Sequence, residues 1–114
     1  MLNVKDKGRL LQIIKRCQRI EDRLQNVDKE RFEINEDIIE VICFNIFQIG
    51  ELAGGFDDGF IEKYNAVPWR LIKGMRNRIV HGYDTIDLDI VWNTARESVP
   101  ELKRYCEEIL TSEI

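Results

Sequence analysis

The sequence predicts an all-α protein: an up-and-down bundle of four to five helices with a kink in its C-terminal helix. Apolar residues recur at alternating spacings of three and four along most of the chain, and N-capping residues precede these segments. Sustained period-two alternation, hairpin dipeptides and internal repeats are absent from the sequence. By the usual size of domains, residues 1–114 are expected to form a single domain.

The first helix is expected to begin after Asn3, which can cap its amino end with Asp6 in the first turn. Its apolar stripe follows at helical spacing: Leu10, Ile13, Cys17, Ile20, Leu24 and Val27. Charged residues occupy most of the intervening positions, as is typical of a helix that packs along one seam.

The second helix is expected to run from Asn35, an N-capping residue, to the pair Gly54-Gly55. It is apolar on nearly all sides, which is typical of a helix at the centre of a bundle or in a subunit interface. Asn45, Gln48 and Glu51 follow each other at spacings of three. They form either an internal hydrogen-bonded strip or one wall of a polar cleft, and the sequence leaves both open.

A short helical or irregular piece follows around Phe60, and Pro68 fits the first turn of a third helix that is expected to end at Gly82. Gly74 lies inside this helix. Because an interior glycine costs about 1 kcal/mol relative to alanine, we expect another backbone to approach closely there.

The last helix has the clearest helical period in the chain, with Thr85 or Asp87 as its N-cap. Its apolar positions are Leu88, Trp92, Ala95, Val99, Leu102, Cys106 and Ile109. Pro100 falls within this period, and Ser98 with Glu101 has the pattern of a capping box. We therefore expect a bend near Ser98 to Pro100.

The composition is that of a soluble globular protein, with 44% apolar and 33% charged residues. The longest apolar run is Val41 to Phe44, so no membrane span is expected, and the polar N-terminus predicts neither a signal peptide nor export from the cytoplasm. Cys17, Cys43 and Cys106 lie among apolar residues and are expected to be buried free thiols. No metal-ligand constellation, P-loop or dinucleotide fingerprint is present, so neither a metal nor a cofactor is expected.

The charge is unevenly distributed. From Lys63 to Tyr83 there are five basic residues and no acidic one, so the formal charge of -4 divides into +5 in this window and -9 elsewhere. The basic residues are Lys63, Arg70, Lys73, Arg76 and Arg78. An acidic protein with one local positive field is a candidate for binding an anion at that place.

The window also contains His81, the sole histidine, five residues after Arg76. A histidine can exchange a proton near neutral pH, and an arginine can hold a phosphate with a planar fork of donors. On an ideal helix these two positions diverge by about 140°. They can share a site only if the helix unwinds at its end or if a second subunit closes the cleft.

The segment Pro68 to Tyr83, together with Ile49-Gly50-Glu51 and Asp87 to Thr94, resembles the HepT-like branch of the HEPN superfamily. The resemblance extends from about Ile38 to Tyr105. The family signature is an arginine, four residues, a histidine, any residue and a tyrosine. Arg76, His81 and Tyr83 fill it, with Asn77 as the polar residue after the arginine.

This resemblance implies a metal-independent endoribonuclease that is the toxin of a type VII-like toxin-antitoxin pair. It implies a homodimer in which two motifs meet in one cleft, an RNA substrate, and a nucleotidyltransferase antitoxin of the MNT type that can AMPylate Tyr83. RNA supplies its own nucleophile, the 2′-hydroxyl, so His81 is the acid-base candidate, Arg76 the phosphate clamp and Asn77 an orienting residue. Candidates for further RNA contacts are Arg70, Lys73 and Arg78.

Two other functions are compatible with these residues. A noncatalytic subunit of a minimal nucleotidyltransferase that binds nucleotide or RNA would use the basic window without needing His81. A simple dimerisation module would use the apolar second helix as its interface.

Overall fold

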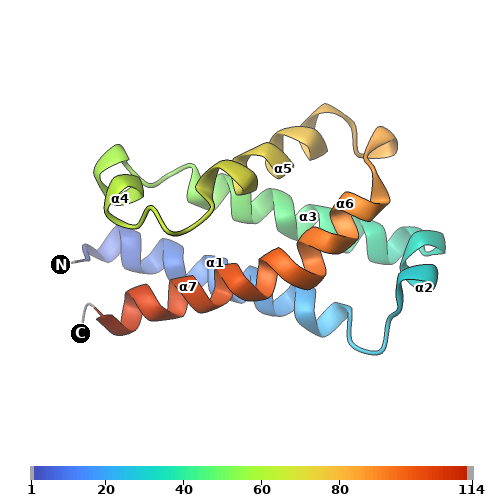
Figure 1. Cartoon of the computed structure of the whole chain (residues 1–114), viewed down its shortest axis with the longest axis horizontal. Helices are drawn as coiled ribbons and strands as arrows, with labels where there is room; N and C mark the ends of the chain where they lie inside the picture. Colours follow the sequence, from blue (N-terminus) through green and yellow to red (C-terminus); the bar gives the residue numbers. More distant parts are fainter. Residues whose placement is uncertain (1, 113–114) are drawn as a thin grey trace.

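The computed structural model describes the backbone of residues 2–112 and, within that range, every side chain except that of Tyr83. Its long helices are α1 (Val4–Arg23), α3 (Glu36–Ala53), α5 (Trp69–Gly82) and α7 (Val99–Ser112). Shorter segments connect them: α2 (Lys29–Ile34), α4 (Asp58–Lys63), the 3-10 turn η1 (Tyr83–Thr85), α6 (Leu88–Asn93) and the π-helical turn η2 (Thr94–Ser98). Successive long helices run in opposite directions along the long axis of the molecule (Figure 1). This up-and-down arrangement confirms the predicted all-α bundle.

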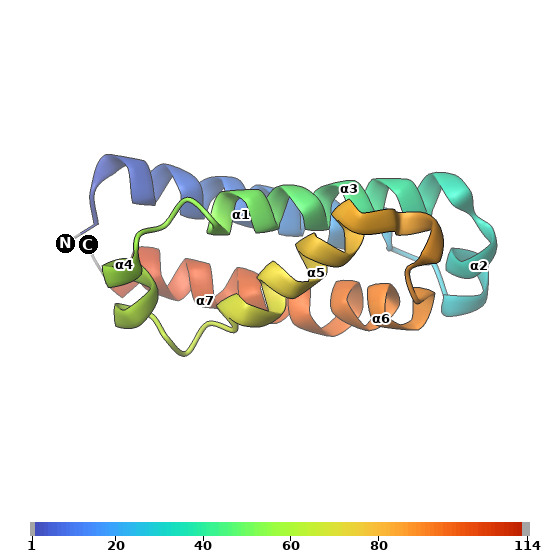
Figure 2. The same ribbon diagram turned by 90° about the horizontal axis from the view of Figure 1, so that it is seen from above.

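Helix α1 packs against both α3 and α7, and α5 lies on the outer side of α3. Figure 2 shows α5 running diagonally across the other long helices. Nine of the 18 residues of α3 are buried, as expected for a central helix. By contrast, Met75 is the only buried residue in the 14-residue α5, all of which is described. Helix α5 is therefore a peripheral helix with a broad accessible face.

The helix starts follow the predicted capping residues. The side chain of Asn3 accepts a hydrogen bond from the Asp6 N–H at 2.7 Å. Asn35 accepts one from the Ile38 N–H at 3.0 Å. Asp87, rather than Thr85, caps α6 by accepting from the Asp89 N–H at 2.9 Å. These local bonds satisfy backbone donors that have no partner within the helix.

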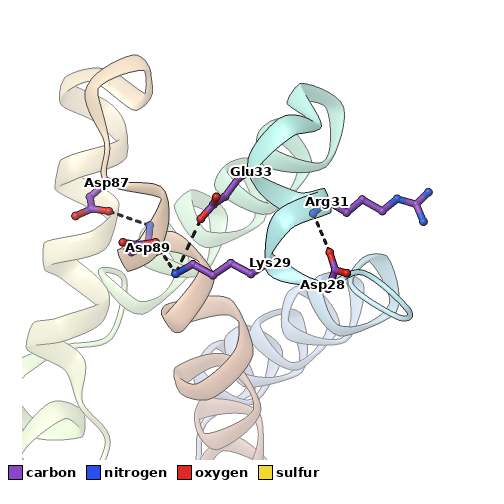
Figure 3. Close-up of polar contacts among 6 residues, drawn as sticks. All are labelled: Asp28, Lys29, Arg31, Glu33, Asp87 and Asp89. Atoms are coloured by element: carbon purple, nitrogen blue, oxygen red, sulfur yellow. Dashed lines mark hydrogen bonds and ion pairs between the residues drawn. The ribbon is translucent and has the colours of Figure 1, made fainter.

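Helix α2 was not expected from the sequence. Asp28 caps it by accepting from the Arg31 N–H at 2.8 Å, and Phe32 buries its ring in the core. Lys29 joins α2 to α6, because its Nζ lies 2.7 Å from Oδ1 of Asp89 and 4.0 Å from Oε1 of Glu33 (Figure 3). The hydrogen bond to Asp89 raises the pKa of Lys29. This contact connects the first turn of α6 with α2.

The expected bend in the C-terminal helix is confirmed, but its cause is a π-helical turn. Within η2, the Val99 N–H donates to the carbonyl of Thr94, five residues back. Pro100 follows directly and has no N–H, so the regular four-residue bond to Arg96 cannot form. The helix does not restart with a capping box, because Ser98 is itself part of the π-helical turn.

The three cysteines are free and buried, as predicted. Burial raises the pKa of Cys43 to about 11 and that of Cys106 to about 12, and it also raises the pKa of Cys17. These thiols therefore stay protonated in the folded protein and serve as small apolar side chains. Among residues 2–112, the structure contains no helix of the length and hydrophobicity that a membrane span requires.

The close approach of two helices occurs at Gly50 of α3, and the expectation for Gly74 is wrong. A Cβ atom added at Gly50 would overlap Cβ of Arg76 and lie 2.6 Å from its Cγ. At Gly74, apart from the adjacent residues and the backbone of its own helix, no described atom lies within 4 Å of the corresponding position. Gly50 thus lets α5 cross α3 at short distance, whereas Gly74 faces open space.

These two glycines form a matched pair for mutation. We expect Gly50→Ala to destabilise the protein by about 1 to 3 kcal/mol, because the Cβ of Arg76 is fixed to its helix and α5 must shift. We expect Gly74→Ala to stabilise it by about 0.5 to 1 kcal/mol, because alanine is the better residue in a helix interior. Urea unfolding followed by circular dichroism measures both changes. Equal effects of the two substitutions would contradict this account of the crossing.

Candidate functional site

Arg76 lies at the centre of the candidate site, on the side of α5 that faces α3. Its Nε and Nη2 atoms both lie 2.6 Å from Oε1 of Glu51. Its Nη1 donates to Oδ1 of Asn77 at 3.0 Å, and its guanidinium lies 5.7 Å from the ring centre of Phe47. The guanidinium plane is therefore fixed by a carboxylate, an amide and an aromatic ring.

This arrangement leaves Arg76 able to bind an anion. A guanidinium carries five N–H groups, and the contacts with Glu51 and Asn77 use three of them. The side chain is 35% exposed, so two donors remain for a ligand without loss of the ion pair. An oriented arginine of this kind suits a planar, two-point contact with a phosphate group.

His81 occupies the last turn of α5, and its side chain is exposed. The helix continues through it and ends at Gly82, whose φ of +149° favours glycine. The predicted end of the helix is confirmed, but the helix does not unwind before His81. Among the described residues, the imidazole makes no hydrogen bond or ion pair.

Helix geometry explains why one chain does not unite Arg76 with His81. The buried side of α5 is formed by Met75 and the half-buried Ile72 and Ile79. His81 lies on the opposite, outer side, within about 40° of Asn77 but about 140° from Arg76. Asn77 is half-buried, lies between them around the helix axis, and accepts a hydrogen bond from the guanidinium of Arg76.

The predicted RNA-contacting residues are all exposed, and in the described part of the chain none has an ion-pair partner. Arg70 and Lys73 line a cavity of about 800 Å³ together with Arg76 and Asn77. Arg78 does not line it and contributes only to the surface charge of α5. The cavity lies between α1, the end of α3, α4 and the first turns of α5, and it also takes in Arg9 of α1.

Tyr83, the predicted site of modification, begins η1 immediately after Gly82. Its side chain lies outside the described part of the structure. The backbone nevertheless puts this residue at the end of α5 that carries His81, directly before the turn into α6.

The polar strip on α3 combines both alternatives that the sequence left open. Asn45 is 4% exposed and satisfied internally, because it donates to the carbonyl of Val41 at 2.8 Å and accepts from Nη1 of Arg16 at 3.3 Å. Glu51, six residues further along, lines the cavity and accepts from Arg76. The described residues contain no group of three or more His, Cys, Asp or Glu side chains that could hold a metal ion.

Comparison with known proteins identifies the family of the chain. Residues 13–109 match the model of the family described as "HepT-like: Ribonuclease HepT-like". The chain belongs to the HepT-like ribonuclease family. This confirms the resemblance that Arg76, His81 and Tyr83 carry, and the matched region spans nearly the whole bundle from α1 to α7.

Several curated relatives of this HepT-like chain are named as ribonucleases. A "Putative RNase" of Caldanaerobacter subterraneus subsp. tengcongensis is 30% identical over 101 residues, which is 89% of this chain and 90% of the relative. A "Putative RNase" of Methanocaldococcus jannaschii is 31% identical over 86 residues, 75% of this chain and 71% of the relative. A "Probable ribonuclease HepT" of Thermococcus cleftensis is 27% identical over 103 residues, 77% of this chain and 93% of the relative. No solved structure matches the chain significantly.

Two residues of the site were not assigned a role from the sequence of this HepT-like protein. Glu51 was grouped with the polar strip of α3, and nothing in the sequence pairs it with Arg76, which lies 25 residues away on another helix. Arg9 was one of many charged positions along α1. The only available signal was Gly50 beside Glu51, since a glycine in an otherwise apolar helix indicates a close neighbour.

Proposed function

We propose that this chain is a metal-independent endoribonuclease that acts as the toxin of a toxin-antitoxin pair. The observation that supports this best is the fixed guanidinium of Arg76, which keeps two donors beside a basic cavity and shares a helix with His81. Membership of the ribonuclease family and the names of the relatives agree with this proposal.

In the proposed reaction, the 2′-oxygen of the RNA attacks the adjacent phosphorus and the bond to the 5′-oxygen breaks. The imidazole of one His81 accepts the proton from the 2′-hydroxyl and, as imidazolium, gives a proton to the leaving 5′-oxygen. Arg76 donates to the phosphate oxygens as negative charge builds on them, and Asn77 keeps the guanidinium in place. No step requires a metal ion.

The proposed site is completed by a second copy of the chain. Arg76 and His81 lie on different sides of α5, so the partner's His81 would serve the phosphate held by Arg76 across a twofold axis. The exposed stripe of α3 supports this, because Val41 is 39% and Phe44 is 54% exposed on the same side of the helix as Glu51. An apolar stripe beside the ion pair suits a self-complementary interface.

The first prediction from the proposed function concerns the cleavage reaction. We expect single-stranded RNA to be cleaved in the presence of EDTA, and a strand with a 2′-deoxynucleotide at the scissile position to resist. Arg76→Ala and His81→Ala should each lower the rate by about a hundred to ten thousandfold, whereas Arg104→Ala on α7 should leave it unchanged. The measurement is gel electrophoresis of end-labelled RNA.

EDTA-sensitive cleavage, or full activity of the His81 variant, would refute the mechanism. Binding of RNA without any cleavage would favour the noncatalytic binding subunit, for which the supporting observation is an exposed imidazole that has no partner in the described part of the chain.

The second prediction tests the shared site by mixing two inactive proteins, Arg76→Ala and His81→Ala. A mixed dimer would keep one of the two composite sites in its cleft, with an intact Arg76 from one chain and an intact His81 from the other. We therefore expect activity to return on mixing, up to roughly a quarter of the wild-type value if subunits exchange randomly and each intact composite site works independently. If native mass spectrometry detects the mixed dimer and cleavage stays absent, both residues act within one chain.

The third prediction concerns silencing by the nucleotidyltransferase partner. We propose that the partner transfers AMP from ATP to the hydroxyl of Tyr83, which forms a phosphodiester and releases pyrophosphate. Intact-mass measurement should show the added AMP, and RNA cleavage should fall because bulk and negative charge now stand next to His81. Tyr83→Phe should gain no mass. A Tyr83→Phe protein that is modified equally would exclude this residue as the acceptor.

A further inference from the structure

The cavity beside Arg76 has a basic wall, of which the proposed reaction uses Arg76 alone. Arg9, Arg70, Lys73 and Arg76 line it, against two acidic residues. One of these acids, Glu51, is already paired with Arg76, which leaves an excess of positive charge in the cavity. Such an excess in a hollow surface attracts anions.

Among the basic residues of this wall, Arg9 has a buried side-chain nitrogen without a hydrogen-bond partner in the described structure. Its Nε atom is buried and has no hydrogen-bond partner, and its guanidinium has no ion-pair partner among the described residues. The group packs against Gly55, where an added methyl would overlap Cζ and lie 2.6 Å from Nε. The terminal nitrogens of Arg9 are not among the buried unpaired atoms, so they are the donors that an anion in the cavity can reach.

The basic wall is continuous with the proposed reaction centre. Arg70 and His81 are eleven residues apart, which is close to three turns, so both face outward along α5 at a separation of about 16 Å. Lys73 and Asn77 lie between them at helical spacing. A polyanion that follows this face of α5 therefore meets a row of donors from the cavity to the histidine.

We propose that the Arg9 cavity binds a backbone phosphate of single-stranded RNA, a few nucleotides away from the phosphate that is cleaved. This inference rests on the proposed function and adds a second anchoring point to it. Trp69 and Phe56 also line the cavity, and their rings pack at 5.5 Å between centres, so an aromatic surface lies beside the cations. Phosphate contacts combined with aromatic surface are the usual means of holding single strands without sequence preference.

Fluorescence anisotropy of a 5′-labelled 2′-O-methyl RNA tests this inference, because the probe cannot be cleaved. We expect Arg9→Gln to weaken binding by about tenfold or more for two unrelated sequences, since one charged hydrogen-bonding contact is lost. The slope of log affinity against log salt should decrease by about 0.7. Arg23→Gln, at the other end of α1, is the matched control and should change neither value.

A second variant distinguishes the effect of the position of the Arg9 guanidinium from the effect of its charge. Gly55→Ala keeps every charge but pushes the Arg9 guanidinium aside, and it should weaken binding while circular dichroism shows an intact fold. Unchanged affinity and salt slope in Arg9→Gln would overturn the inference, as would failure of the wild-type protein to bind the probe at low salt.

A parallel assay of the cleavage of natural RNA distinguishes failure of the cavity proposal from failure of the proposed ribonuclease activity. If the wild-type protein cleaves RNA and Arg9→Gln binds the probe equally well, the cavity proposal fails and the ribonuclease stands. If Arg9→Gln weakens binding but natural RNA is never cleaved, the ribonuclease fails and the cavity proposal stands.

Discussion

The crossing of α3 and α5 at Gly50 is the constraint on which the candidate site depends. Helix α5 has a single buried residue, so its position cannot be set by a deep core of its own. The missing side chain at Gly50 admits the stem of Arg76, and Glu51, the next residue, receives the guanidinium. Because both partners are partly exposed, the ion pair adds little to stability, and its effect is to fix the orientation of Arg76.

The parts of the fold that the sequence predicted are those with local signals. Helical period and side-chain caps such as Asn3, Asn35 and Asp87 act within a few residues, and they identified α1, α3 and α6. Helix α2 was missed because six residues are too few to establish a period. The sequence predicted a close approach at Gly74 and none at Gly50, because which interior glycine meets a neighbour is decided by tertiary packing. Arg9 and Glu51 joined the site for the same reason.

The uneven charge gives the folded protein one side suited to RNA. The basic residues of α5 point outward or into the cavity, and the excess of acidic residues lies in the rest of the bundle. The local positive charge therefore favours the approach of a polyanion to α5 over the rest of the bundle. Helix α5 is also the long helix with the fewest buried residues, so most of its side chains are accessible to a ligand.

The pairing of Arg76 with Glu51 suggests a division of labour between binding and catalysis. A carboxylate beside the guanidinium lowers its attraction for a ground-state phosphate, so Arg76 is a poor source of substrate affinity. In the proposed complex, Arg9, Arg70 and Lys73, which have no ion-pair partner in the described structure, supply that affinity at a distance from the scissile bond. The oriented donors of Arg76 then matter most when charge on the phosphate increases. Interactions that strengthen in the transition state raise the rate, whereas uniform binding does not. In the proposed reaction, the ion pair with Glu51 therefore makes Arg76 selective for the transition state.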